Sequence, residues 1–105
     1  MSFNSVCAEK LATELHGKIV TNNPAGLQVH ITESDGSILD MATTTPAGGY
    51  TLDLTIMDTP SQTEVEKLTL EVKNKFGKKK KYKIKNYIKS FGNTVELKPI
   101  LYIAN

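Results

Sequence analysis

The chain has no arginine and no tryptophan, and it has a single cysteine among 105 residues. One cysteine excludes a disulfide within the chain, so the fold must rest on a hydrophobic core, and a reducing compartment is compatible with it. The lack of tryptophan leaves valine, isoleucine, leucine and tyrosine to build that core. No apolar run approaches the length that spans a bilayer, so we expect no membrane span.

The sequence also lacks the patterns that catalysis or metal binding requires. It has no nucleophile beside a base, no metal-ligand spacing and no phosphate-binding glycine loop. His16 and His30 fall on different predicted strands without cysteine or paired carboxylates nearby, and we interpret both as solvated. Asp35 and Gly36 suit a hairpin turn better than an acid site. We therefore expect a non-enzymatic protein with no catalytic residue, no cofactor and no metal site.

The length of the chain is that of one domain. We expect an N-terminal arm or short helix over residues 1–14 and one β-domain over residues 15–105. The first residues lack the charged and apolar regions of a secretory signal. The expected location is therefore a virion or the cytoplasm of synthesis, or the extracellular space if the sequence is a fragment of a secreted protein.

Alternation of apolar and polar residues between turn signals predicts an all-β fold, a seven-stranded Greek-key sandwich of the Ig-like kind. The predicted strands are residues 15–21, 27–33, 38–43, 50–57, 65–74, 78–88 and 94–103. The segment 38–43 is expected at a sheet edge, and Pro99 is expected to mark an edge or a bulge.

Parity within each strand predicts which side chains are buried. In the strand 50–57 the predicted inward residues are Tyr50, Leu52, Leu54 and Ile56. In the strand 94–103 they are Val95, Leu97, Leu101 and Ile103. A buried tyrosine hydroxyl usually finds a partner, so we expect that of Tyr50 to reach the backbone.

Residues 17–54 carry a recurring pattern of glycine, proline and threonine. Gly17 opens the first strand, Pro24 and Gly26 precede the second, and a threonine-rich loop runs into Gly49 and Tyr50. This pattern resembles the carboxypeptidase regulatory-like, or transthyretin-like (prealbumin-like), β-sandwich domains over about a third of the chain. The resemblance implies an accessory or adhesive role, and such folds host unrelated functions.

Two chemistries found among relatives of this kind are not expected here. The hydroxyisourate hydrolases use histidines, an arginine and a C-terminal Tyr-Arg-Gly-Ser, whereas this chain has no arginine and ends in Leu-Tyr-Ile-Ala-Asn. Domains with a Lys–Asn isopeptide bond need a buried acid between the partners. Lys18 and Asn93 could be such partners, but the glutamate-bearing motif is missing and Lys18 neighbours the predicted inward Ile19.

Lysines gather in one part of the chain. Nine of the thirteen lysines lie within residues 73–89. Residues 1–66 hold nine acidic residues and two lysines, a net charge of −7, whereas residues 67–105 hold two acidic residues and eleven lysines, a net charge of +9. The overall charge of +2 thus hides a polarised sequence. The candidate partner-binding residues are Lys75, Lys78, Lys79, Lys80, Lys81, Lys83 and Lys85.

The lysine cluster has three interpretations. Lysines on an exposed strand prevent edge-to-edge aggregation. They also attract an acidic protein partner or a neighbouring subunit. Finally, they bind the phosphates of nucleic acid or an anionic membrane, although the lack of arginine counts against reading of specific bases.

We expect a structural or interaction protein, a component of a larger assembly such as a bacteriophage virion, as a capsid decoration or head-tail accessory protein. Its partners are acidic proteins or neighbouring subunits, in a homo-oligomer or symmetric assembly. One alternative is a ligand- or glycan-binding module of a bacterial surface or secreted protein, which an exposed aromatic platform would favour. A second alternative is non-specific nucleic-acid binding through the lysine hairpin.

Overall fold

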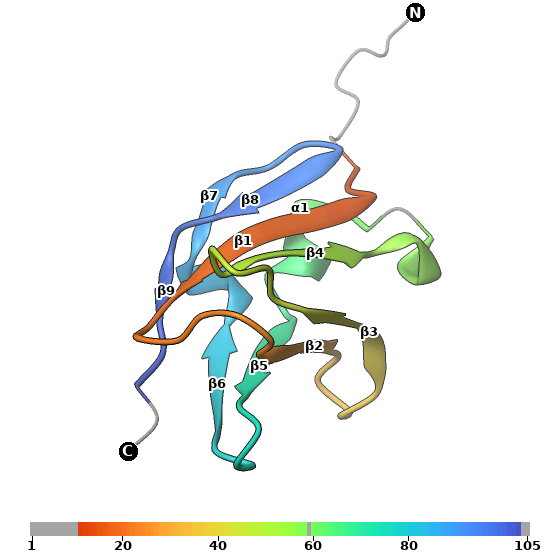
Figure 1. The fold of residues 1–105 in the computed structure, drawn as a ribbon. Helices are drawn as coiled ribbons and strands as arrows, with labels where there is room; N and C mark the ends of the chain where they lie inside the picture. The colour runs from red at the N-terminus through yellow and green to blue at the C-terminus, as the bar shows by residue number, and fades with distance from the viewer. Residues whose placement is uncertain (1–10, 59, 104–105) are drawn as a thin grey trace, which may run out of the picture.

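The computed structural model of the protein describes residues 11–58 and 60–103. Within them the chain forms two β-sheets that face each other, as Figure 1 shows. The predicted all-β fold is confirmed, but the described residues form nine strands rather than seven. Residues 1–10 of the predicted arm (residues 1–14) lie outside the described residues. The last residue of the predicted arm, Glu14, is the first residue of the first strand.

One sheet is built around the first strand. Its order is β4 (Gly49–Asp53), β1 (Glu14–Val20), β8 (Thr94–Leu97) and β7 (Ile88–Ser90), and β9 (Ile100–Leu101) also pairs with β1. The pairing of β1 is antiparallel with β4 and parallel with both β8 and β9. The first and last strands of the described chain thus lie side by side.

The other sheet is antiparallel throughout. Its order is β3 (Ile38–Thr43), β2 (Gln28–Thr32), β5 (Thr69–Lys73) and β6 (Lys79–Lys83). The predicted edge position of residues 38–43 is confirmed, since β3 pairs only with β2. The lysine-rich strand β6 forms the opposite edge of this sheet.

The core lies between the two sheets, where alternate residues of each strand meet. Its fully covered side chains are aliphatic apart from one tyrosine. The largest are Tyr102, Leu15, Ile19, Ile31, Leu52, Leu54, Leu70, Ile84, Ile100, Val29, Val65 and Val72. The strict alternation that predicted β2, β4 and β5 therefore reflects one buried and one open face for each strand.

The strand predicted over residues 50–57 ends early. After β4 the chain turns into a 3₁₀-helix, η2 (Thr55–Met57), whose entry is fixed by a hydrogen bond from the Thr55 amide to Asp53 Oδ1 at 2.8 Å. The period of a 3₁₀-helix is three rather than two, which changes the side chains that face inward. The prediction that Ile56 is buried is wrong, since this residue is 69% exposed and Met57 packs against the core instead.

A short helix precedes the predicted strand 65–74 and includes only its first residue, Val65. It is α1 (Gln62–Val65), and it begins with a capping box in which Ser61 Oγ accepts from the Glu64 amide and Glu64 Oε1 accepts from the Ser61 amide. The strand β5 starts only at Thr69, and its alternate residues Leu70 and Val72 are buried, as is Leu68 just before it.

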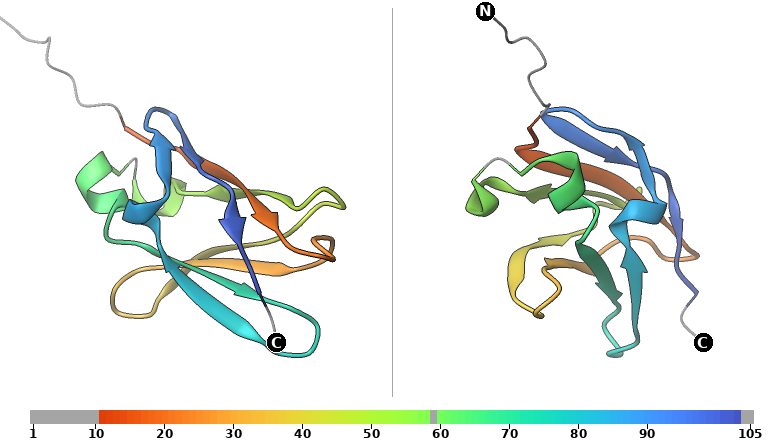
Figure 2. Two further views of the ribbon diagram at one scale, coloured as in Figure 1. Left: turned by 90° about the vertical axis from the view of Figure 1, so that its left-hand side faces the viewer. Right: turned by 180° about the vertical axis from the view of Figure 1, so that it is seen from behind.

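The segment predicted as one strand over residues 78–88 changes sheet midway. It forms β6, then the 3₁₀-helix η3 (Ile84–Asn86), and then β7 in the other sheet. Figure 2 shows η3 at this crossing between the sheets. The alternation of lysines at odd-numbered positions of β6 therefore ends at Lys83, and Lys85 lies in η3.

The sequence predicts an edge or a bulge at Pro99, whereas in the structure the last predicted strand breaks there into β8 and β9. The break also reverses the parity of the residues that follow. Ile100 and Tyr102 are buried, whereas Leu101 is 61% exposed and Ile103 is 47% exposed. The prediction that Leu101 and Ile103 are core residues is therefore wrong.

Candidate binding surface

The feature that concentrates charge is the segment 73–85, named here the basic hairpin. Its turn is fixed by Asn74, whose Oδ1 accepts the amides of Phe76 at 2.9 Å and Lys78 at 3.0 Å. Gly77 supplies a positive φ of 80°, which suits glycine. These local bonds hold the tip of the hairpin, so the lysines on either side project from a defined backbone.

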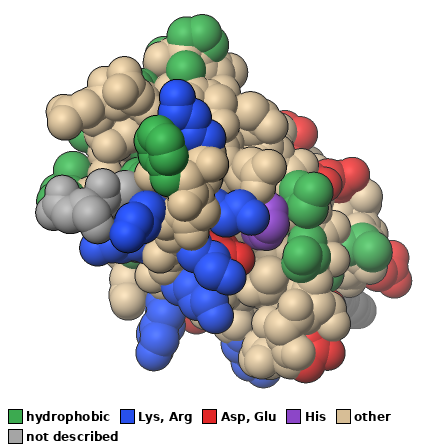
Figure 3. Space-filling model, turned by 60° about the horizontal axis from the view of Figure 1, so that its bottom comes forward, with side chains coloured by type: hydrophobic (Ala, Val, Ile, Leu, Met, Phe, Trp, Pro, Cys, Tyr) green, Lys and Arg blue, Asp and Glu red, His purple; other side chains and the backbone are tan. Residues whose placement is uncertain are grey.

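The candidate lysines share this hairpin but not one face of the sheet. The register between β5 and β6 places Lys79, Lys81 and Lys83 on the outer face, and Lys80 falls on the other parity although it is exposed. The remaining candidates lie outside the strand: Lys75 and Lys78 in the turn, and Lys85 in η3. Figure 3 shows lysines gathered over this part of the surface.

One carboxylate lies among these lysines. Glu71 of β5 is directly opposite Lys81 in the register, and its Oε2 lies 3.9 Å from Lys79 Nζ. Its Oε1 lies 3.8 Å from His30 Nδ1 of β2, and both side chains are 17% exposed. His30 thus has the predicted outward parity but is mostly covered rather than solvated. A single carboxylate leaves the hairpin strongly positive.

Acidic residues mark the opposite edge of the sandwich. The Asp53 amide of β4 donates to Asp40 Oδ2 of β3 at 2.7 Å, which brings the two edge strands together. A hydrogen bond from the Thr55 backbone lowers the pKa of Asp53, and one from the Ser37 backbone lowers that of Asp35. Since β3 and β6 are the two edges of one sheet, charge is separated across the width of the molecule.

Two tyrosines fasten the basic hairpin to the last strand. Tyr82 Oη donates to the Leu101 carbonyl at 3.1 Å, and Tyr102 Oη donates to the Lys78 carbonyl at 2.5 Å. Burial raises the pKa of Tyr82, with smaller contributions from Tyr87 and Tyr102, so its hydroxyl stays protonated as a donor. The Tyr82 and Tyr87 rings meet edge to face at 5.9 Å. The hairpin is thereby anchored to the other sheet.

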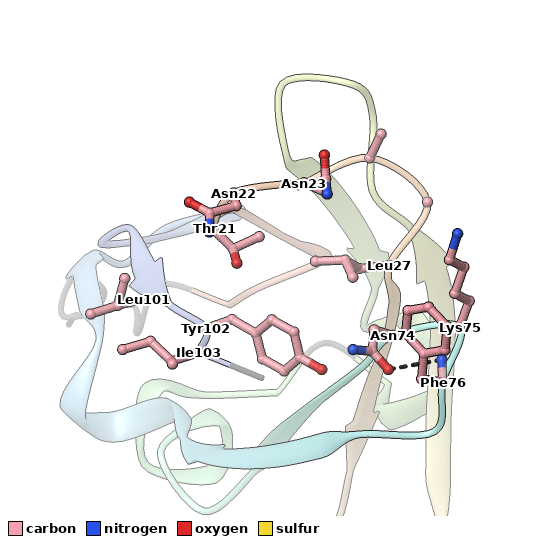
Figure 4. A pocket seen from close by; sticks show the side chains of 12 residues that line it. Thr21, Asn22, Asn23, Leu27, Asn74, Lys75, Phe76, Leu101, Tyr102 and Ile103 are labelled. Carbon is pink, nitrogen blue, oxygen red and sulfur yellow. Dashed lines mark hydrogen bonds between the residues drawn. The ribbon is translucent and has the colours of Figure 1, made fainter. Parts of the chain in front are cut away.

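A groove of about 630 Å³ opens beside the tip of the hairpin (Figure 4). Its walls come from the β1–β2 connection, the hairpin tip and the segment after β9. Phe76 is 77% exposed at its rim, with Lys75 Nζ 5.2 Å from the ring centroid. The sequence places Phe76 next to a turn but not beside Leu101 and Ile103, which are distant in the chain.

The remaining predicted features are not assembled into a site. His16 Nε2 lies 3.0 Å from Glu14 Oε1, and no three His, Cys, Asp or Glu side chains of the described residues form a group suited to a metal ion. The Tyr50 hydroxyl is buried without a hydrogen-bond partner among the described residues, which therefore do not show the expected bond to the backbone. No helix in residues 11–58 and 60–103 is long and apolar enough to cross a membrane.

The pattern of residues 17–54 has a structural role in joining two loops. Thr44 is buried, its Oγ1 accepts the Leu27 amide at 2.8 Å, and its hydroxyl donates to the Pro24 carbonyl. Gly48 has a φ of 91°, and its carbonyl oxygen accepts a hydrogen bond from the Ile19 amide at 2.8 Å. These contacts give Thr44 and Gly48 a structural role in this segment.

Comparison with known proteins finds no matching family model, no matching curated protein and no matching solved structure. The resemblance to carboxypeptidase regulatory-like domains therefore stays a prediction from the sequence.

Proposed function

We propose that the protein is a non-enzymatic interaction module that docks on an acidic protein surface through the basic hairpin. The observation that supports this proposal is the separation of charge across the sandwich, with lysines at the β6 edge and Asp40 and Asp53 at the β3–β4 edge. A surface of one sign attracts a complementary partner and orients it during encounter.

The partner that we propose is a neighbouring subunit in a repeated assembly. A second copy of the chain offers an acidic β3–β4 edge of its own, and contact between unlike surfaces generates rings or filaments. A bacteriophage virion is the setting we propose for such an assembly, on the sequence pattern alone.

Binding to poly-L-glutamate tests the docking proposal with matched variants. Changing Lys79, Lys81 and Lys83 to glutamate lowers the formal charge by two per site, from +2 to −4. Changing Lys18, Lys67 and Lys98 to glutamate gives the same net charge outside the hairpin. We expect the hairpin variant to bind at least about tenfold more weakly than the control variant. An equal loss of affinity in the two variants would show that net charge alone drives binding.

A second candidate function is binding of a glycan in the groove beside the hairpin. The observation that favours it is Phe76, an exposed ring at the rim, with the amide side chains of Asn22, Asn23 and Asn74 among the lining residues. Such sites combine apolar area with a few polar groups. Titration of a panel of oligosaccharides, with Phe76→Ala as the variant, tests it, and loss of a measured affinity in the variant is the expected result.

A further inference from the structure

The outer edge of β6 carries backbone groups that face away from the sheet. The Asn74 amide donates to the Lys78 carbonyl, and the Ile84 amide donates to the Leu68 carbonyl. In the register of β5 and β6, the hydrogen-bonded pairs are therefore those between even-numbered residues. Hydrogen-bonded and non-hydrogen-bonded pairs alternate along an antiparallel ladder. The amides and carbonyls of Lys79, Lys81 and Lys83 therefore point away from β5, on the side of β6 where no strand of the described residues pairs with it.

The other sheet edges in the described part of the chain are protected or irregular. At β4, the Gly49 amide donates to Thr45 Oγ1 and the Asp53 amide to Asp40 Oδ2. The pairing of β3 shifts register near Thr32, and β7 is three residues long with a shift of its own. Only β6 combines five unbroken pairs with outward backbone groups that no described residue caps.

Side-chain direction links this free edge to the lysines. Lys79, Lys81 and Lys83 carry the outward backbone groups, and all three side chains lie on the outer face of the sheet. A strand added beside β6 would place every second side chain next to this row. Acidic residues at those positions match the lysines, whereas a strand without them leaves the lysines facing apolar or like-charged neighbours.

We propose that β6 accepts an extended acidic segment of a partner as an added strand, with Asp or Glu at alternate positions opposite Lys79, Lys81 and Lys83. This inference rests on the proposed docking function and specifies the form of the partner. Backbone hydrogen bonds supply affinity in this mode, and the alternate side chains supply selectivity. The three lysines thus make binding selective for an acidic segment.

The test uses a labelled peptide in which glutamate and valine alternate over seven residues, and fluorescence anisotropy as the readout. A scrambled peptide of the same composition with its glutamates in one block is the first control. Two N-methylated versions, one modified at the glutamates and one at the valines, form a matched pair, because only one alternate set of amides faces β6.

We expect the alternating peptide to bind at least about tenfold more tightly than the block peptide, and one N-methylated version to lose binding while the other keeps it. We also expect the amides of Lys79, Lys81 and Lys83 to gain protection from hydrogen exchange in the complex. Equal binding of all four peptides would overturn strand addition and leave docking on acidic surfaces intact. Absence of binding by every acidic peptide at low salt would overturn the docking function itself.

Discussion

At the scale of single residues, the most unusual contact is that between Gly17 and Tyr50 on neighbouring strands. The two residues are directly opposite in the β1–β4 register, and the tyrosine ring lies over the glycine. A Cβ placed on Gly17 would lie 2.1 Å from Tyr50 Oη. The glycine is thus required by the space that the ring fills, while the ring covers a position that has no side chain of its own.

Gly17→Ala is expected to destabilise the fold by about 2 kcal/mol or more, because overpacking in a core displaces the ring or the strand. The free energy of unfolding in urea measures this effect. In the background of Tyr50→Leu the same change should cost much less, since the ring is gone. An equal cost in both backgrounds would contradict the account of this contact.

Tyr50→Phe and Tyr102→Phe each remove a tyrosine hydroxyl group, but we expect different effects on the free energy of unfolding. In the part of the chain that the structure describes, the Tyr50 hydroxyl is buried without a hydrogen-bond partner, so its removal should leave the free energy of unfolding unchanged or raise it by up to about 1 kcal/mol. The Tyr102 hydroxyl donates to the Lys78 carbonyl, so its removal should lower stability by about 1 kcal/mol. Urea unfolding of the two variants at neutral pH decides the point, and effects of the same sign would contradict it.

Alkaline pH gives a separate test of Tyr50. Burial raises the pKa of Tyr50 above its ordinary value of 10.0, so the unfolded chain releases this proton before the folded chain does. The contribution of this group to stability is therefore complete below about pH 10 and falls as the pH rises further. We expect Tyr50→Phe to lose less stability than wild type between neutral pH and about pH 11, measured by urea unfolding. An identical loss would contradict burial of this hydroxyl.

At the scale of elements, the predictions succeeded where alternation continues and failed where the chain leaves a strand. Asn74 and Gly77 are turn signals between the predicted strands 65–74 and 78–88, and alternation within a strand predicts the buried faces of β2 and β5. The exposure of Ile56 follows from a 3₁₀-helix, which no alternation reveals. The capping-box pair Ser61 and Glu64 is a sequence signal for α1, and it lies ahead of the predicted strand 65–74.

The candidate site could be predicted only in part, for a related reason. Sequence proximity placed the lysines together, but the edge position of β6 depends on strand order, which pairs residues far apart in the chain. Neither the bond from Tyr82 to the Leu101 carbonyl nor the groove beside Phe76 has a local signal in the sequence. Contacts of this kind arise from packing between segments rather than from any periodicity.

Ser61→Ala tests the capping box of α1. The change removes the acceptor for the Glu64 amide and should lower the free energy of unfolding by about 1 kcal/mol. Thr63→Ala, at an exposed position of the same helix, is the control and should have a smaller effect. Equal effects of the two changes in urea unfolding would mean that the cap adds nothing to the fold.

At the scale of the whole molecule, the charge separation predicts salt-sensitive contact between copies. We expect the lysine edge of one copy to attract the β3–β4 edge of another at low ionic strength, and at about 0.5 M salt this attraction is screened within a few ångströms. Light scattering after size exclusion should therefore give a mass above 11.6 kDa at low salt and about 11.6 kDa at high salt. A mass of 11.6 kDa in both conditions would exclude a second copy as the partner.

We propose that the basic hairpin, rather than the overall charge, is the docking surface. Nuclear magnetic resonance of the isotope-labelled protein, titrated with poly-L-glutamate at about 0.15 M salt, tests it most directly. We expect the chemical-shift changes to concentrate in residues 73–85 and in the β5 residues that pair with them. Changes of equal size around Lys18, Lys67 and Lys98 would contradict it, because those lysines lie outside the hairpin.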